Sequence, residues 1–286
     1  MTTSALLGLP APAKLNLFLH VTGQREDGKH LLESIFELID LYDTIDLYML
    51  ERDCIERTGD VIGSKEADLC VRAAQLIKKR FGIQQGIRIH VTKRIPSGAG
   101  MGGGSSDAAT TLIGLNRLFK LNLSRTQLMQ LGEQLGADVP FFIFGKTGFV
   151  EGIGEQITPL EIPSARYAII WPGISISTAH IFADPHLTRN TKSIKMLVFS
   201  GAVREAWPKL IGHNDLQSVA TRLEPRLHTS LEMLATCNSA RMTGSGSAVF
   251  GLIHESTKYQ LPELPEQWIG FIAKSLPKHP LYQWLS

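Results

Sequence analysis

Alternating apolar and polar positions predict strands in the first part of the chain. Residues 14–22 (KLNLFLHVT) carry leucine or valine at every second position, with Lys14, Asn16, Phe18 and His20 between them. This period of two is typical of a strand that buries one face. Residues 45–50 (IDLYML) and 86–92 (GIRIHVT) alternate in a similar way, and we expect strands there too.

Other stretches have the period of a helix. Residues 66–82 (EADLCVRAAQLIKKRFG) show helical spacing and end at a glycine, which often stops a helix. In residues 124–136 (SRTQLMQLGEQLG), Ser124 and Gln127 suit a capping box and Gly136 a stop. Another helical face is formed by Ala108, Leu112, Leu115 and Phe119. Residues 141–150 (FFIFGKTGFV) follow as a predicted strand.

The order of these elements predicts the fold class. Strands and helices are intermixed without strict alternation, which favours an α+β fold. Residues 155–172 hold three prolines and a further predicted strand, and we place a boundary between two lobes in this segment. The predicted lobes are residues 1–160 and 161–286.

Composition narrows the functional classes. The 286 residues are 43% hydrophobic and 20% charged, enough for a sizeable core, and the net charge of +2 gives no electrostatic case for nucleic acid. The three cysteines are scattered, which favours a reducing compartment over a zinc site. With neither a basic leader nor a long apolar run, we expect a soluble cytoplasmic protein that does not engage a membrane. No motif specifies the oligomeric state, and both a monomer and a weak homodimer stay open.

A glycine cluster is the most informative motif. Residues 98–104 contain five glycines, and an apolar helical pattern follows them. The stretch lacks the GK[ST] of a Walker A loop. Gly98, Gly100 and Gly103 do match GxGxxG, but no acidic residue lies between Asp107 and Glu133 to hold a ribose, so the dinucleotide interpretation fails.

The cluster instead suits an anion. A glycine loop that enters a helix, here capped by Ser105 or Ser106, directs free backbone N–H groups and a positive dipole end toward one point. The alternative is a flexible turn that only caps a helix, for which one glycine is enough. We therefore predict a phosphate site, formed by Pro96, Ser97, Gly98, Ala99, Gly100, Met101, Gly102, Gly103, Gly104, Ser105 and Ser106.

Several ordered segments carry a family resemblance. They are residues 12–30 (PAKLNLFLHVTGQREDGKH), 96–109 (PSGAGMGGGSSDAA), 135–145 (LGADVPFFIFG), 173–185 (GISISTAHIFADP), 213–216 (HNDL) and 242–251 (MTGSGSAVFG). Together they resemble the GHMP kinases. The resemblance implies a two-lobed fold with the active site between an N-terminal ATP-binding lobe and a C-terminal lobe that contributes to the substrate site.

The resemblance also implies a reaction and its catalytic residues. It implies ATP-dependent phosphorylation of an alcohol, with Mg²⁺, and most closely of the 2-hydroxyl of a cytidine-diphosphate-linked methylerythritol in non-mevalonate isoprenoid biosynthesis. Asp138, predicted in a short loop between Gly136 and Pro140, is implied as the general base, and Lys14 as the cation that keeps it ionised. Without the resemblance, Asp138 suits a loop cap equally well and Lys14 suits an edge strand. No carboxylate is an evident magnesium ligand, so phosphates, water and a loop serine are expected to hold the ion.

The implied substrate site has one departure from the family pattern. Asn16 is implied to contact the substrate, His30 to hydrogen-bond the cytosine edge and Phe182 to stack on its face. The position of a second stacking aromatic is occupied by Lys29, which cannot stack. The residues at 244–247 form a glycine turn that the resemblance places over the active site.

Other functions remain open at this stage. A second small-molecule kinase of the same fold, of the homoserine or mevalonate class, agrees with Lys29 but less well with His30 and Phe182. A non-catalytic nucleotide-binding module is disfavoured by the presence of both Lys14 and Asp138. A dehydrogenase is the weakest alternative, because the ribose-binding acid is missing.

Overall fold

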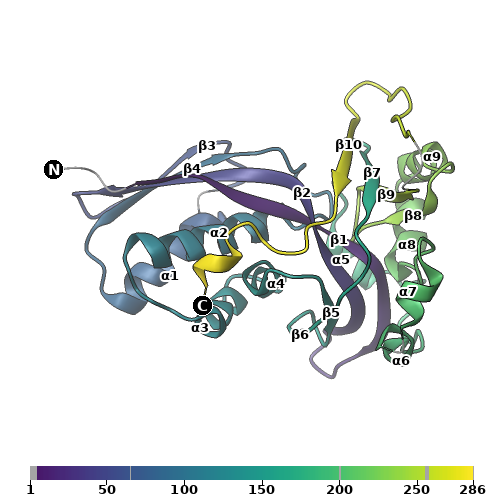
Figure 1. Cartoon of the computed structure of the whole chain (residues 1–286), viewed down its shortest axis with the longest axis horizontal. Coiled ribbons are helices and arrows are strands. Elements are labelled where there is room, and N and C mark those ends of the chain that lie inside the picture. Colours follow the sequence, from purple (N-terminus) through teal and green to yellow (C-terminus); the bar gives the residue numbers. More distant parts are fainter. Residues whose placement is uncertain (1–4, 65, 200, 255–257, 286) are drawn as a thin grey trace.

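Two long antiparallel strands connect the halves of the molecule. The computed structural model describes residues 5–64, 66–199, 201–254 and 258–285. In it, β1 (Ala5–Gln24) pairs with β2 (His30–Leu50) from Ala5–Tyr48 to Gln24–His30, and the ribbon bends from one half into the other (Figure 1). Residues of both halves therefore meet along one pair of strands.

The first half is a sheet covered by helices. Its strands are ordered β3 (Ile55–Gly59), β4 (Gly86–Thr92), β2, β5 (Gly148–Glu151) and β6 (Gln156–Pro159), with β1 beside β2. The helices are α1 (Leu69–Phe81), α2 (Gly103–Leu118), α3 (Arg125–Glu133) and α4 (Val139–Phe144). Apolar side chains of this sheet and these helices form one core.

The second half is a smaller sheet with its own helices. The strand order is β10 (Ile269–Lys274), β7 (Arg166–Trp171), β9 (Val249–Ile253) and β8 (Asn238–Met242). The helices are α5 (Thr178–Ala183), α6 (Lys195–Phe199), α7 (Ala202–Ala206), α8 (Asp215–Leu223) and α9 (Arg226–Met233). The predicted α+β class is confirmed. Among the described residues, no helix is long and apolar enough to cross a membrane.

Several predicted elements are confirmed. The helix predicted at 66–82 is α1, with Gly82 in the left-handed conformation at its C-terminus, and the strand predicted at 86–92 is β4. Ser124 and Gln127 form the expected capping box, although α3 ends at Glu133, three residues before the predicted stop.

The prediction that residues 14–22 bury only one face is wrong. Leu15 and Val21 are fully buried, and on the other face Phe18 is fully buried while Lys14 and His20 are only 3% and 2% exposed. Because β1 lies between two cores, both of its faces are covered. The alternation of polar residues here marks a buried polar site rather than a solvated face.

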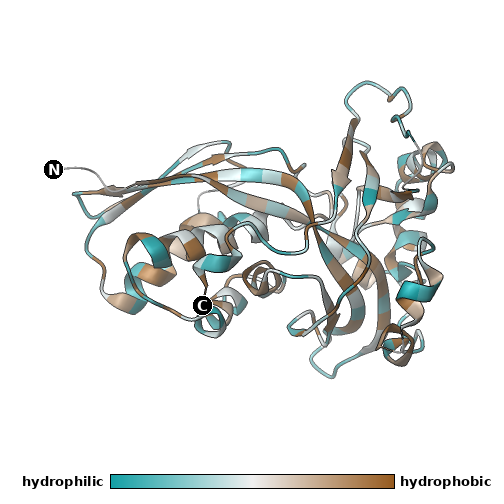
Figure 2. Cartoon of the chain, viewed as in Figure 1, coloured by the Kyte–Doolittle hydropathy of each residue, from teal (hydrophilic) through white to brown (hydrophobic). Residues whose placement is uncertain are grey.

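The strand predicted from residue 141 is also wrong in its first half. Residues 139–144 form the helix α4, and only residues 148–151 form a strand. Pro140 at the start and Gly145, with φ of 72° at the end, are the helix signals that the short apolar run concealed. Figure 2 shows α4 as an almost wholly apolar helix, and its residues from Val139 to Ile143 are buried.

The C-terminal segment returns to the first half after β10. Leu281 and Leu285 are buried in the first core, and the short helix at Tyr282–Trp284 lies beside α3 and α4 (Figure 1). The predicted lobe boundary between residues 160 and 161 stays a prediction. Because residues 276–285 pack against the first half, they would belong to the N-terminal lobe if the lobes were defined by their packing.

Candidate active site

The glycine loop is held in place by close contacts with the second half. Gly98 and Gly100 have φ of 67° and 75°, in the left-handed region that disfavours side chains. A Cβ on Gly100 would overlap the carbonyl oxygen of Thr243. The amides of Ser247 and Ala248 donate to the carbonyls of Gly98 and Ala99 at 3.2 and 3.0 Å. The glycines thus let two backbones from different lobes touch.

The predicted cap is wrong. The N-cap of α2 is Gly102, with φ of 71° and no side-chain hydrogen bond, and both serines lie inside the first turn. The amides of Gly103, Gly104 and Ser105 have no acceptor among the described residues, as expected for the first turn of a helix. An N-terminus without a capping side chain leaves these donors for a ligand.

Ser105 and Ser106 differ in whether they can contact a ligand in the cavity. Ser106 is fully buried, and its hydroxyl donates to the carbonyl of Pro12 at 2.6 Å while its amide donates to Gly102. The prediction that Ser106 contacts phosphate is therefore contradicted by its engaged donors. Ser105 lines the cavity, together with every residue from 96 to 104.

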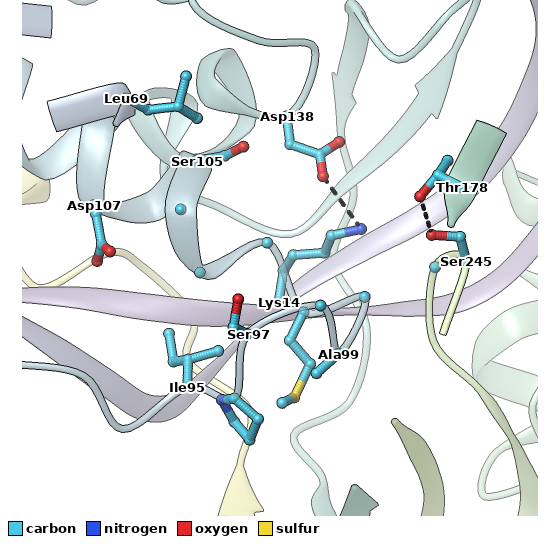
Figure 3. Close-up of a pocket in the computed structure, with 18 of the residues that line it drawn as sticks. Lys14, Leu69, Ile95, Ser97, Ala99, Ser105, Asp107, Asp138, Thr178 and Ser245 are labelled. Atoms are coloured by element: carbon cyan, nitrogen blue, oxygen red, sulfur yellow. Dashed lines mark hydrogen bonds and ion pairs between the residues drawn. The ribbon is translucent and has the colours of Figure 1, made fainter. Parts of the chain in front are cut away.

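The cavity contains the predicted base and cation. Its volume is about 490 Å³, and Lys14 and Asp138 line it together with the glycine loop (Figure 3), to which Lys14 is bound by the hydrogen bond from its amide to the carbonyl of Met101 at 3.0 Å. Lys14 Nζ lies 3.7 Å from Asp138 Oδ2. Asp138 is the N-cap residue of α4 rather than a loop residue before a strand, and its side chain makes no capping hydrogen bond. The carboxylate is thus free to face the cavity.

Lys14 is held by several contacts. Its ammonium lies 4.2 Å from the centroid of the Phe36 ring and donates to Asn16 Oδ1. Burial lowers the pKa of Lys14, and the Asp138 carboxylate opposes this effect. Asn16 is 1% exposed, and its amide nitrogen donates to Ser34 Oγ at 3.0 Å. Both ends of the Asn16 amide are therefore engaged, which positions Lys14, and its contact with substrate stays a prediction.

A charged cluster joins the two ends of the glycine loop. Lys93, before the loop, contacts Asp107, in α2, at 2.7 Å and also pairs with the fully buried Asp43. Asp43 accepts hydrogen bonds from the amides of Arg94 and Ile95 at 2.6 and 2.8 Å. Burial raises the pKa of Asp107 to about 7 despite the ammonium beside it. Sequence reasoning missed this cluster, because no local spacing links residue 43 to residues 93 and 107.

The second glycine segment also reaches the cavity. Gly244, Ser245 and Gly246 line it, and Ser245 Oγ lies 2.6 Å from Thr178 Oγ1 (Figure 3). Asn214 caps α8 and donates to the carbonyls of Met242 and Gly244 at 2.8 Å each. The HNDL motif therefore anchors this segment through Asn214, and its last residue, Leu216, lines the cavity.

The residues predicted for cytosine lie together. The rings of His30 and Phe182 stack, with centroids 4.8 Å apart and planes at 27°. Phe182 lines the cavity, and Lys29 is exposed in the turn before β2. The structure therefore groups His30 with Phe182, and it leaves Lys29 at the surface.

The described residues contain no cluster of three or more His, Cys, Asp or Glu side chains suited to a metal ion. At the glycine loop, Ser97 and Ser105 each bring a hydroxyl group to the cavity (Figure 3).

Comparison with known proteins agrees with this fold. The model of the GHMP kinases N terminal domain matches residues 68–146, and that of the GHMP kinases C terminal matches residues 201–264. These segments contain the glycine loop with Asp138, and the second glycine segment.

Full-length relatives define the class further. The chain is 44% identical over 291 residues to the 4-diphosphocytidyl-2-C-methyl-D-erythritol kinase of Burkholderia ambifaria, covering 100% of this chain and 99% of that protein. It is 46% identical to the enzyme of the same name from Thiobacillus denitrificans, over 96% and 98% of the two chains. A crystal structure of 4-(cytidine 5'-diphospho)-2C-methyl-D-erythritol kinase superposes with a TM-score of 0.77 at 30% identity, over 95% and 99%. The chain therefore belongs to the GHMP kinase family, among its 4-diphosphocytidyl-2-C-methyl-D-erythritol kinases, and is an ATP-dependent phosphotransferase of the non-mevalonate isoprenoid pathway.

Proposed function

We propose that this enzyme transfers the γ-phosphoryl group of ATP to the 2-hydroxyl of 4-diphosphocytidyl-2-C-methyl-D-erythritol. The observation that carries the proposal is the Lys14–Asp138 pair, 3.7 Å apart, in the same cavity as the glycine loop. Phosphoryl transfer requires positioning and charge neutralisation more than covalent chemistry by the protein, and this cavity supplies both.

The glycine loop binds the phosphates in this proposal. The free amides at the start of α2 hydrogen-bond the phosphate oxygens, and the dipole of the sixteen-residue helix favours their negative charge. Ser105 adds a hydroxyl at the same place. Mg²⁺ accompanies ATP, held by phosphates and water with the Ser105 hydroxyl as the protein donor, and neutralises part of the phosphate charge.

Asp138 and Lys14 act on the accepting hydroxyl. Asp138 accepts the proton of the 2-hydroxyl as its oxygen forms a bond to the γ-phosphorus and the bond from phosphorus to the β-phosphate oxygen breaks, releasing ADP. Lys14 stabilises the carboxylate and the negative charge that develops on the attacking oxygen. Asn16 fixes the ammonium, because its amide oxygen accepts from Lys14 while its amide nitrogen is bound to Ser34.

The cytidine end of the substrate occupies the region of His30 and Phe182. Phe182 offers a ring face, and His30 offers a ring edge with hydrogen-bonding nitrogens. Lys29 contributes no ring, so stacking comes from one protein aromatic. We also propose a cytoplasmic location for the enzyme, in keeping with the free thiols of Cys54, Cys70 and Cys237.

A substrate panel tests the proposal. ADP release is measured with ATP and Mg²⁺ in the presence of 4-diphosphocytidyl-2-C-methyl-D-erythritol, mevalonate or homoserine, with Asp138→Ala beside the unaltered enzyme. We expect turnover only with the cytidine substrate, and its loss in Asp138→Ala. Turnover with mevalonate or homoserine instead would contradict the proposed substrate, and equal turnover in Asp138→Ala would contradict the proposed base.

A further inference from the structure

One arginine contacts both residues of the predicted cytosine site. Arg189 Nε donates to His30 Nε2 at 3.0 Å, and Arg189 Nη2 donates to the carbonyl of Phe182 at 2.8 Å. The guanidinium also donates to the carbonyls of Asp184 and Leu187 at 2.8 and 3.1 Å. All three of its nitrogens thus donate hydrogen bonds, to His30, to the end of α5 and to the loop that follows it. The guanidinium is fixed in one orientation.

This contact determines where His30 carries its proton. A guanidinium is always protonated and has no acceptor, so in the Arg189–His30 hydrogen bond Nε2 must supply the lone pair. A neutral imidazole has one N–H, which is therefore on Nδ1. Burial and the positive charge of Arg189 both lower the pKa of His30, which opposes a second proton. No hydrogen bond joins Nδ1 to any residue that the structure describes.

Arg189 also connects His30, the proposed donor to the edge of the base, with Phe182, the proposed stacking ring. Phe182 stacks on the His30 imidazole, and its backbone carbonyl is one of the groups bound by the guanidinium. Without Arg189, the tautomer of His30 would no longer be fixed and the backbone of Phe182 would lose a hydrogen bond. Sequence spacing gave no sign of this link, because residue 189 lies in an unremarkable polar segment far from residue 30.

We propose that Arg189 is a specificity-determining positioning residue, which holds His30 as an Nδ1–H donor and thereby selects cytosine over uracil. Ring nitrogen N3 of cytosine is an acceptor and pairs with an N–H donor, whereas N3 of uracil carries a proton and would meet that donor without a partner. Sites that hydrogen-bond a ligand discriminate strongly when a polar group is left unpaired. This inference rests on the proposed function, in which the substrate carries a cytidine.

The tautomer is measured directly by NMR. In ¹⁵N-histidine-labelled protein, two-bond ¹H–¹⁵N correlations distinguish Nδ1–H from Nε2–H, and His30→Gln identifies the His30 signals among the nine histidines. We expect His30 to be an Nδ1–H tautomer at neutral pH, and to lose this single state in Arg189→Met. An Nε2–H tautomer, or a doubly protonated ring, in the unaltered protein would overturn the inference.

The preference for cytosine is measured as the dissociation constants of CDP and UDP by calorimetry. This measurement does not depend on turnover. We expect CDP to bind about tenfold or more tightly than UDP. In Arg189→Met the two affinities should come within about threefold of each other, and Arg189→Lys, which keeps the charge but has only one donating nitrogen, should give a ratio in between. The matched control is Arg222→Met, because Arg222 pairs with Asp184 of the same loop without touching His30, and its ratio should not change.

The outcomes separate this inference from the proposed function. The role of Arg189 would be overturned if the ratio of CDP affinity to UDP affinity did not change in Arg189→Met. It would also be overturned if this ratio fell equally in Arg222→Met. His30→Asn provides a second variant if Arg189→Met does not fold: the freely rotating amide should also bring the ratio near one, and a retained ratio would overturn the inference. Failure of the enzyme to release ADP with the cytidine substrate would instead contradict the proposed function, whatever the ratio.

Discussion

Arg125 fastens the C-terminal segment to the helix that carries Asp138. Its guanidinium donates to the carbonyls of Ile143 and Phe144, at 3.0 Å each, at the end of α4. It also donates to Tyr282 and Leu285, at 3.1 and 2.7 Å, and lies 3.8 Å from the centroid of the Tyr282 ring. Arg125→Ala removes all of these contacts at once.

The expected loss follows from these contacts. A buried hydrogen bond to a charged group contributes about 1.5–3 kcal/mol. The total here is smaller than four times this value, because the four bonds share one side chain and water can reach the partly buried carbonyls once the side chain is truncated. We therefore expect Arg125→Ala to cost about 2–4 kcal/mol in the free energy of unfolding. For a chain of this size that lowers the melting temperature by about 5–10 °C.

The assay is thermal unfolding followed by circular dichroism at neutral pH, with Arg117→Ala as the control. Arg117 is exposed, and among the described residues its side chain makes only a cation–π contact to Trp284, 5.5 Å from the ring centroid, so its loss should cost less than about 1 kcal/mol. Equal melting temperatures for the two variants would refute the view that Arg125 anchors the C-terminal segment.

Three further changes test other parts of the structure. Gly100→Ala should abolish activity, because its Cβ would overlap the Thr243 carbonyl at a φ of 75°, whereas Gly23→Ala, whose Cβ meets the Leu31 side chain at 3.5 Å outside the cavity, should retain it; equal activity in both would contradict the close-packed loop. Burial raises the pKa of Glu37 to about 8, so the folded state keeps a proton that the unfolded state loses above its ordinary pKa. The unfolded state then binds fewer protons, and Glu37 should make stability fall between about pH 4.5 and pH 8 by up to ~1.4 kcal/mol per unit. Thermal unfolding of Glu37→Gln at pH 5.5 and 7.5 should show a smaller fall than the unaltered protein, and an identical fall would exclude this group as the cause. Lys29→Tyr should lower the KM for the cytidine substrate, since a second aromatic face is worth about 1–3 kcal/mol; an unchanged KM would show that the base does not stack at this position.

Much of the local structure was predictable because its signals are local. Caps, glycine stops and regular periods identified α1, the start of α3 and β4 to within three residues. The glycine cluster predicted a phosphate site, because free amides at a helix start need only the sequence around them. The resemblance to a family then supplied Lys14 and Asp138, which the structure places 3.7 Å apart.

What the sequence did not reveal depends on contacts between distant segments. The burial of both faces of β1 follows from its position between two cores, which no alternation pattern contains. The apolar run of α4 was too short to distinguish a helix from a strand. The Asp43–Lys93–Asp107 cluster and the contact of Arg189 with His30 join residues that are remote in the chain, and only the fold brings them together.

The most direct test of the central claim is the single-turnover rate of phosphoryl transfer in Asp138→Asn. The enzyme is mixed in excess over 4-diphosphocytidyl-2-C-methyl-D-erythritol with γ-labelled ATP and Mg²⁺, and the labelled product is quantified after rapid quenching. Asn keeps the shape of the side chain but cannot accept the proton, so the rate should fall by about 10²- to 10⁴-fold while ATP binding changes little. Asp46→Asn, at a carboxylate that accepts from the Gly8 amide away from the cavity, should react at the normal rate. A rate in Asp138→Asn within tenfold of the unaltered enzyme would contradict Asp138 as the general base.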